Sequence, residues 1–174
     1  MTVREAERFA CSQQVLAARR DGLRSRMVAQ GFDAALLSHA RDVLYYTGTA
    51  QPANLAVFAD REPILFARRA VEFVERDVDD LEVRHEASFS GPVAEFLAAG
   101  GQRLGAALDV VPATHIRRLE AKLPGWEVAD ISPVVLAQRS VKAACEIEAI
   151  TRSASLAAVA DETIRRVLVP GLTP

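Results

Sequence analysis

One short stretch of the chain decides its fold: Asp33-Ala34-Ala35-Leu36-Leu37-Ser38. It is apolar in the middle and polar at both ends, as expected for a central strand that is buried on both faces of a sheet. The residues before it predict an amphipathic helix over 3–30, which Gly31 ends and Asp21-Gly22 offers a place to break. The apolar positions of that helix are Phe9, Leu16, Leu23 and Met27.

The residues after this strand predict a hairpin and then an alternation of helices and strands. Residues 55–59 and 64–67 are apolar and are separated by Asp60-Arg61-Glu62-Pro63, which suits a tight reversal between antiparallel strands. Helices are then predicted over 70–78, 91–99 and 113–123, and strands over 81–84, 104–108 and 126–129. This order predicts an α/β layered sandwich around a mostly parallel sheet of about five or six strands, made mixed by the hairpin.

The pattern changes after residue 131. Residues 132–168 predict a linker helix followed by a long helix, and no glycine interrupts them. We expect an α/β domain over 1–131 and, over 132–174, the linker helix and first helix of a truncated second domain. The second part carries an apolar surface that a compact first domain does not need: Ala143, Ile147, Ile150, Ala154, Ala157, Val159, Ile164, Val167 and Leu168.

Composition excludes several classes of partner. The chain has 21 basic and 23 acidic residues among 174, so its net charge attracts neither nucleic acid nor an anionic membrane. The first twenty residues are too rich in charge for a signal peptide, and no stretch is apolar enough to span a bilayer, so a cytoplasmic protein is expected. Cys11 and Cys145 lie far apart without a metal-binding or redox spacing, and we predict two reduced thiols.

No catalytic or metal-binding motif is present. The three histidines, His39, His85 and His115, have no second histidine three or four residues away. The chain has no G-x-S-x-G elbow, no G-x-G-x-x-G after a strand and no phosphate loop. We therefore predict no catalytic residue and no metal ligand within this sequence.

The segment most typical of a functional site is residues 39–54, which we predict to be a loop. It contains both tyrosines and directly follows the central strand, where ligand-facing loops of open α/β sheets lie. An equally weighted alternative is that the tyrosine pair only packs, with its hydroxyl groups hydrogen-bonded. The candidate residues for contact with a substrate or partner subunit are Tyr45, Tyr46, Gly48, Thr49, Gln51 and Asn54.

The same segment resembles a known family. The creatinase/prolidase N-terminal domain has a passage of the form G-x-D-A-hydrophobic followed by R-Y-x-T-G, which is similar here to residues 31–37 and 43–48. Later landmarks of the family follow in order and cover nearly the whole chain: Leu104-Gly105 with Asp109, Asp130-Ile131-Ser132, Arg139-Ser140-Val141-Lys142 with Glu146-Ile147, and Pro170-Gly171-Leu172-Thr173. The chain therefore resembles the N-terminal domain of the creatinase, prolidase and aminopeptidase P (pita-bread metallopeptidase) family.

The resemblance implies a fold and a setting for the chain. The fold is a three-layer α/β/α sandwich with a ribonuclease H-like arrangement, followed by a C-terminal helical segment. In the family a second, catalytic domain holds two divalent metal ions, such as manganese, cobalt or zinc, with two Asp, one His and two Glu, all of which would lie beyond Pro174. The resemblance also implies a homodimer in which the loop residues reach the partner's substrate, although Thr49 stands where an aromatic residue is frequent.

Two classes of function are compatible with these features. In the first, the parent protein is a hydrolase, a metal-dependent Xaa-Pro peptidase or related amidinohydrolase acting on a peptide or small amide. This chain is then its assembly and active-site access domain, inactive alone, and its partner is the missing C-terminal catalytic domain. In the second, the chain is a stand-alone protein-interaction module of the same fold, since a fold does not dictate a function.

Overall fold

A computed structural model describes residues 11–168 of the protein. The described residues form two units, one of residues 12–141 and one that joins Cys11 to residues 142–168. The first unit contains every strand and the helices α1 to α6; the second contains α7.

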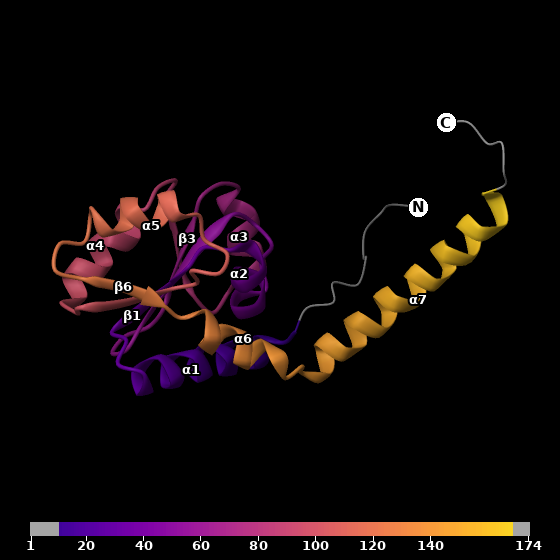
Figure 1. The fold of residues 1–174 in the computed structure, drawn as a ribbon, viewed down its shortest axis with the longest axis horizontal. Coiled ribbons are helices and arrows are strands. Elements are labelled where there is room, and N and C mark those ends of the chain that lie inside the picture. The colour runs from indigo at the N-terminus through magenta and orange to yellow at the C-terminus, as the bar shows by residue number, and fades with distance from the viewer. Residues whose placement is uncertain (1–10, 169–174) are drawn as a thin grey trace. The chain divides into compact units, whose positions relative to one another are not determined.

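A six-stranded sheet with the order β4-β3-β2-β1-β5-β6 forms the centre of the first unit (Figure 1). The predicted central strand is confirmed as β1, which pairs antiparallel with β2 and parallel with β5. The predicted hairpin is confirmed as the antiparallel pair β2 and β3, while β4 and β6 are parallel edge strands. The strands are β1 (Ala34–Leu37), β2 (Ala53–Phe58), β3 (Ile64–Ala67), β4 (Glu82–His85), β5 (Arg103–Ala106) and β6 (Glu127–Asp130).

Helices cover both faces of the sheet and make the predicted three-layer α/β/α sandwich. One face packs against α1, α2, α3 and α6 through a cluster that includes Met27, Tyr46 and Val135. The other packs against α4 and α5 through a cluster that includes Phe96 and Leu119. The helices are α1 (Gln13–Ala29), α2 (Ala40–Thr47), α3 (Val71–Asp77), α4 (Ser90–Ala99), α5 (Ala113–Glu120), α6 (Ser132–Ser140) and α7 (Ala144–Val167).

Close backbone packing explains one glycine in the sheet. Gly105 lies in β5 between β1 and β6, and a Cβ atom there would lie only 2.7 Å from Ile131 Cδ1. Ile131 is fully buried between β6 and α6, so this side chain has little room to move. The absence of a side chain at Gly105 therefore allows α6 to begin close to the sheet.

Two local predictions about the helices are wrong. Residues 39–54 are not a continuous loop, because Ala40–Thr47 forms α2. Helix α1 also runs through Asp21-Gly22 without a break, since one glycine costs a helix only about 1 kcal/mol and the buried Leu23 and Met27 hold it to the sheet. The earlier part of that predicted helix, residues 3–10, lies outside the described residues.

The second unit contains one long helix and a disulfide. Cys11 is bonded to Cys145, at a sequence separation of 134 residues, so the prediction of two reduced thiols is wrong. Spacing along the chain carries no information about two cysteines that only folding brings together. The long predicted helix is confirmed as α7, which buries none of its side chains.

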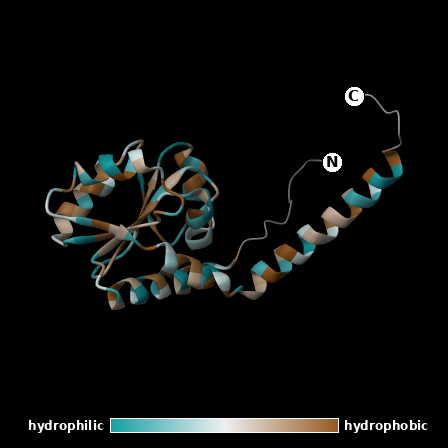
Figure 2. Ribbon diagram, viewed as in Figure 1, coloured by the Kyte–Doolittle hydropathy of each residue, from teal (hydrophilic) through white to brown (hydrophobic). Residues whose placement is uncertain are grey.

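The apolar residues of α7 are exposed in this structure. Figure 2 shows hydrophobic positions recurring along α7 among hydrophilic ones, as the sequence predicts. No helix among the described residues is long and apolar enough to cross a membrane. The large exposed apolar side chains of this part are Ile147, Ile150, Leu156, Val159, Ile164, Val167 and Leu168.

Candidate functional site

Helix α2 begins and ends at specific cap residues. The imidazole of His39 accepts a hydrogen bond at Nδ1 from the backbone N–H of Arg41, at 3.3 Å, and so caps the first turn. Gly48 ends the helix in the left-handed conformation, with φ of 79°, and donates its N–H to the carbonyl of Leu44. A glycine is needed at this place because a side chain would strain that backbone conformation.

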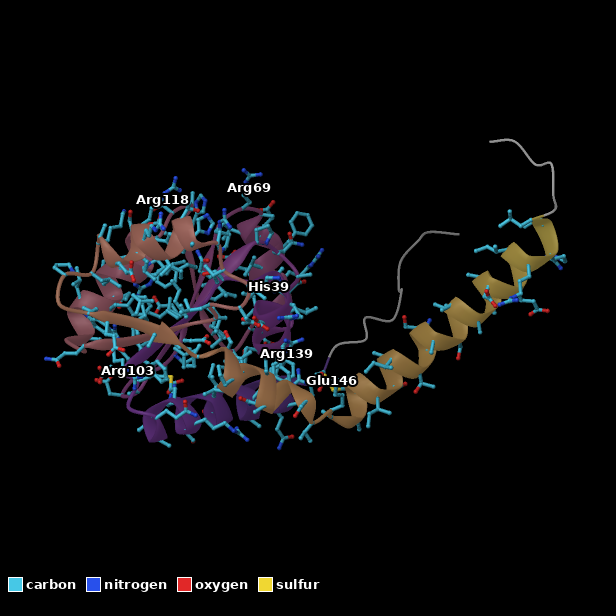
Figure 3. The ribbon with its side chains drawn as sticks, in the orientation of Figure 1. His39, Arg69, Arg103, Arg118, Arg139 and Glu146 are labelled. Carbon is cyan, nitrogen blue, oxygen red and sulfur yellow. A yellow bond between two sulfur atoms is a disulfide. The ribbon has the colours of Figure 1, made fainter. Side chains whose placement is uncertain are left out.

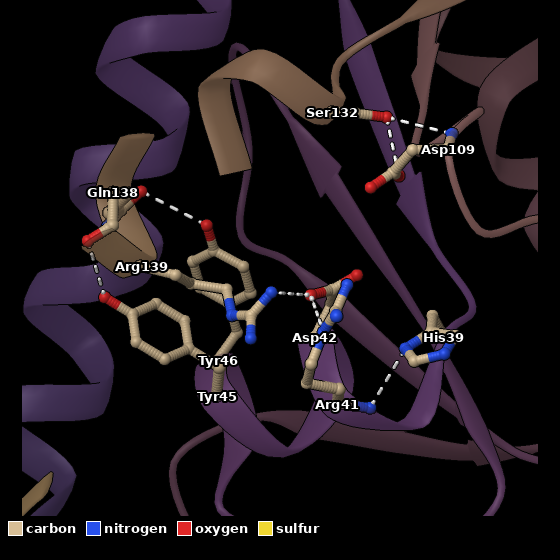
Figure 4. A network of polar contacts seen from close by, with 9 residues as sticks. All are labelled: His39, Arg41, Asp42, Tyr45, Tyr46, Asp109, Ser132, Gln138 and Arg139. Carbon is tan, nitrogen blue, oxygen red and sulfur yellow. Dashed lines mark hydrogen bonds and ion pairs between the residues drawn. The ribbon is translucent and has the colours of Figure 1, made fainter. Parts of the chain in front are cut away.

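The two tyrosines are bound to helix α6 (Figure 4). The hydroxyl of Tyr46, whose side chain is fully buried, donates to Oε1 of Gln138 at 3.2 Å. The hydroxyl of Tyr45 donates to the backbone carbonyl of the same residue at 3.3 Å. One residue of α6 therefore accepts a hydrogen bond from both phenols. These bonds hold α2 against a helix that lies more than ninety residues later in the chain.

An ion pair fixes the other side of α2. The carboxylate of Asp42 is 1 % exposed and accepts a hydrogen bond from Nη1 of Arg139, on α6, at 3.1 Å. Arg41 adds a second positive charge at 3.6 Å. A carboxylate removed from water is tolerated only when it is paired, so this contact determines where α6 lies against α2.

Two arginines of α1 bind the carboxyl end of α2. Arg19 and Arg20 each donate to a carbonyl oxygen at 2.8 Å, that of Tyr45 and that of Tyr46 respectively. These carbonyls belong to the last turn of the helix, where cations are favourable. The Arg19 guanidinium also lies 4.0 Å from the centre of the Tyr45 ring, and Arg20 pairs with Asp80.

The turn after α2 has one buried and one partly exposed side. Thr49 is fully buried; its hydroxyl donates to Asp77 at 3.1 Å and accepts from the backbone N–H of Gln51 at 3.2 Å. Gly48 and Gln51 are partly exposed. Asn54 is the second residue of β2 and is buried, and its Oδ1 has no hydrogen-bond partner among the described residues.

The structure therefore divides the six candidate residues into two groups. Tyr46, Thr49 and Asn54 are buried inside the α/β unit, whereas Tyr45, Gly48 and Gln51 are partly exposed. Burial raises the pKa of the Tyr46 phenol far above its usual value, and the neighbouring Tyr45 and Asp42 add to the effect. Tyr46 therefore stays neutral at any physiological pH and serves as a hydrogen-bond donor.

A second polar cluster, whose residues stood out in the sequence only as family landmarks, joins the turn after β5 to the first residue of α6 (Figure 4). The Ser132 hydroxyl lies 2.7 Å from the carboxylate of Asp109 and 2.5 Å from that of Asp130. The backbone N–H groups of Leu108 and Ser132 also donate to Asp130. Burial by itself raises the pKa of Asp130, but these hydrogen bonds prevail and hold it below its usual value.

The described residues bring together no set of side chains suited to holding a metal ion. Residues 11–168 contain no group of three or more His, Cys, Asp or Glu side chains placed to hold a metal ion. Figure 3 shows His39, just before α2, apart from Arg103 on β5 and Arg118 on α5. His115 contacts Phe89 edge-on, with ring centres 5.7 Å apart, beside a shallow hollow at the ends of β1 and β5.

The family of the chain follows from comparison with known proteins. A family model described as the creatinase/prolidase N-terminal domain matches residues 19–141. The chain belongs to this family. The match covers the sheet and all six helices that pack on it, from within α1 to the end of α6, and so contains every residue of the α2 site.

Solved structures agree with this assignment. The chain is 30 % identical to the N-terminal domain of the cytoplasmic peptidase PepQ from Mycobacterium tuberculosis H37Rv, over 70 % of this chain and 98 % of that one, with a TM-score of 0.63. Comparison with curated proteins gives no match.

Two longer structures share the fold. A Xaa-Pro dipeptidase from Bacillus anthracis is 22 % identical, with a TM-score of 0.78 over 91 % of this chain and 45 % of that one. The prolidase from Pyrococcus horikoshii OT3 is 19 % identical, with a TM-score of 0.77 over 89 % and 44 %. The chain therefore spans less than half the length of these two proteins.

Removing the Arg139 side chain should destabilise the α/β unit through Asp42. We expect Arg139→Ala to lower the free energy of unfolding by about 2 kcal/mol, because it leaves a buried carboxylate with only the more distant Arg41. Arg165→Ala, which breaks an exposed pair with Asp161, is the control and should cost under about 0.5 kcal/mol. Urea unfolding followed by circular dichroism measures both, and equal losses would contradict this account of Asp42.

Tyr46→Phe should change how stability depends on alkaline pH. At pH 7 the free energy of unfolding of the variant should be about 1 kcal/mol lower, because the hydrogen bond to Gln138 is lost. Folding raises the pKa of Tyr46 above its value in the unfolded chain, which is near 10. Above pH 10 the phenol therefore ionises only in the unfolded chain, and the free energy of unfolding of the wild type falls by about 1.4 kcal/mol by pH 11. The free energy of unfolding, measured from pH 7 to pH 11, should therefore show the difference between Tyr46→Phe and the wild type disappearing as the pH rises. A deficit that stays constant to pH 11 would contradict the burial of this phenol.

Proposed function

We propose that this chain is the non-catalytic N-terminal domain of a metal-dependent Xaa-Pro peptidase or a related amidinohydrolase. Its role is in oligomerisation and in access to the active site. The observation that carries the proposal is the match of residues 19–141 to the creatinase/prolidase N-terminal domain. The similarity of the chain to the PepQ N-terminal domain from M. tuberculosis, which covers 98 % of that domain, supports the proposal further.

The proposal assigns the chemistry to a following C-terminal catalytic domain. That domain holds two divalent metal ions, manganese, cobalt or zinc, and acts on a peptide or small amide. Support comes from the B. anthracis dipeptidase and the P. horikoshii prolidase, in which the region similar to this chain is less than half of the protein. A cytoplasmic location is also proposed, because the M. tuberculosis relative is described as a cytoplasmic peptidase.

The access role falls to the exposed side of the turn after α2. We assign it to Tyr45, Gly48 and Gln51, which are partly exposed, in a homodimer where this turn faces the partner's substrate. Tyr46, Thr49 and Asn54 are positioning residues, because they are buried and Tyr46 and Thr49 hold the turn through Gln138 and Asp77. A rigid support of this kind keeps a contact residue in one geometry.

The alternative function is that of a stand-alone protein-interaction module. The exposed apolar face of α7 is compatible with both functions, since such a face is typical of a surface that binds either a following domain or another protein. The two functions differ in what the gene encodes after Pro174. A reading frame that continues with an Asp, Asp, His, Glu, Glu metal-binding set supports the peptidase, and a natural stop codon supports the module.

The purified chain should not hydrolyse a Xaa-Pro dipeptide in the presence of Mn²⁺. We expect no release of proline above the rate in buffer with Mn²⁺ alone, whereas the product of the complete reading frame should be active and lose its activity to a chelator. Metal-dependent turnover by residues 1–174 would overturn the assignment of this chain as non-catalytic.

Gln51→Ala should weaken substrate binding in the complete protein without weakening the fold. Loss of one hydrogen bond to substrate, about 1 kcal/mol, raises KM roughly fivefold and leaves kcat unchanged. Gln102→Ala is the matched control, because Gln102 is exposed and precedes β5, at the opposite end of the strands from Gln51. Equal KM values for the two variants would contradict the access role of this turn.

A further inference from the structure

The disulfide between Cys11 and Cys145 is a feature that the proposed function does not use. These residues are the two cysteines of the chain, and their Cα atoms lie 5.5 Å apart. This separation is typical of disulfides, so the bond forms here without displacement of the backbone. Both residues are partly exposed, which lets a small thiol reach the sulfur atoms.

The bond joins the residue before the cap of α1 to the first turn of α7. Cys11 directly precedes Ser12, the cap residue of α1, and Cys145 is the second residue of α7. Because α7 buries none of its side chains, packing contributes little to holding its first turn. Besides backbone hydrogen bonds from Glu146 and Ile147 to the Ala143 carbonyl, that turn has the disulfide and a hydrogen bond from the backbone N–H of Ala143 to the Glu146 carboxylate, at 3.0 Å.

The position of Cys145 also favours opening of the bond by a thiol. The first N–H groups of a helix have no partner within the helix and stabilise negative charge nearby. A thiolate released at the second residue of α7 gains this stabilisation, which makes the Cys145 sulfur the better leaving group of the two. Attack by an incoming thiolate is therefore expected at Cys11.

We propose that Cys11–Cys145 is a redox modification site that exchanges with a dithiol reductant, and that its reduction releases the first turn of α7. One thiolate of the reductant attacks the Cys11 sulfur, forming a mixed disulfide and expelling the Cys145 thiolate. The second thiol of the reductant then displaces Cys11. Two electrons pass from the reductant, which becomes a disulfide, and the protein gains two protons as two thiols.

A combined redox titration and hydrogen-exchange measurement tests this site. The purified chain is equilibrated in buffers of reduced and oxidised dithiothreitol, and its free thiols are counted by mass after alkylation. In the oxidised protein, the amides of residues 146–150 should exchange on the order of tenfold more slowly than in the reduced protein. The amides of β1 and β5 should exchange equally in both states, because they lie in the sheet.

The variants Cys11→Ser and Cys145→Ser provide the controls. Each should reproduce the fast exchange of the reduced wild type, and added reductant should change neither. The proposal is overturned if the thiols stay free under oxidising conditions, or if the amides of residues 146–150 exchange at the same rate in both states. These readouts do not involve hydrolysis, so they succeed or fail independently of the proposed peptidase.

Discussion

The buried ion pair of Asp42 with Arg139 is the constraint on which the arrangement around α2 depends. A carboxylate that is 1 % exposed must keep a cationic partner, and that partner lies 97 residues later in the chain. Gln138, next to it, accepts the hydroxyl groups of both tyrosines. Helix α6 therefore packs against α2, and the helix after the central strand becomes part of the core.

The sequence was sufficient to predict the sheet, and the reasons are local. Residues 34–37 and the hairpin strands are short apolar runs bounded by polar residues, and such runs are predictable without knowledge of their neighbours. Helix α2 was missed because it has only eight residues and contains Val43, two tyrosines and Thr47, which are weak helix formers. Its stability comes from Arg19, Arg20 and Gln138, and no local pattern reveals such distant partners.

The same distinction applies to the candidate site and to the cysteines. Tyr45 and Tyr46 stood out because they are rare residues after a central strand, yet only the structure shows that Tyr46 and Thr49 face inward. Tyr45, Gly48 and Gln51 are the candidates that stay partly exposed. The pairing of Cys11 with Cys145 was not predictable either, because 134 residues separate them. Membership of the creatinase/prolidase N-terminal family was recognisable, because its landmarks recur in order along the chain.

Hydrogen exchange of residues 40–47 tests most directly whether this segment is a packed helix that supports an exposed turn. In the folded chain, the amides of Val43 to Thr47 should exchange nearly as slowly as those of β1, because opening them requires breaking the contacts of Asp42 and Tyr46. Exchange of these amides within seconds, as in a free loop, would contradict the account.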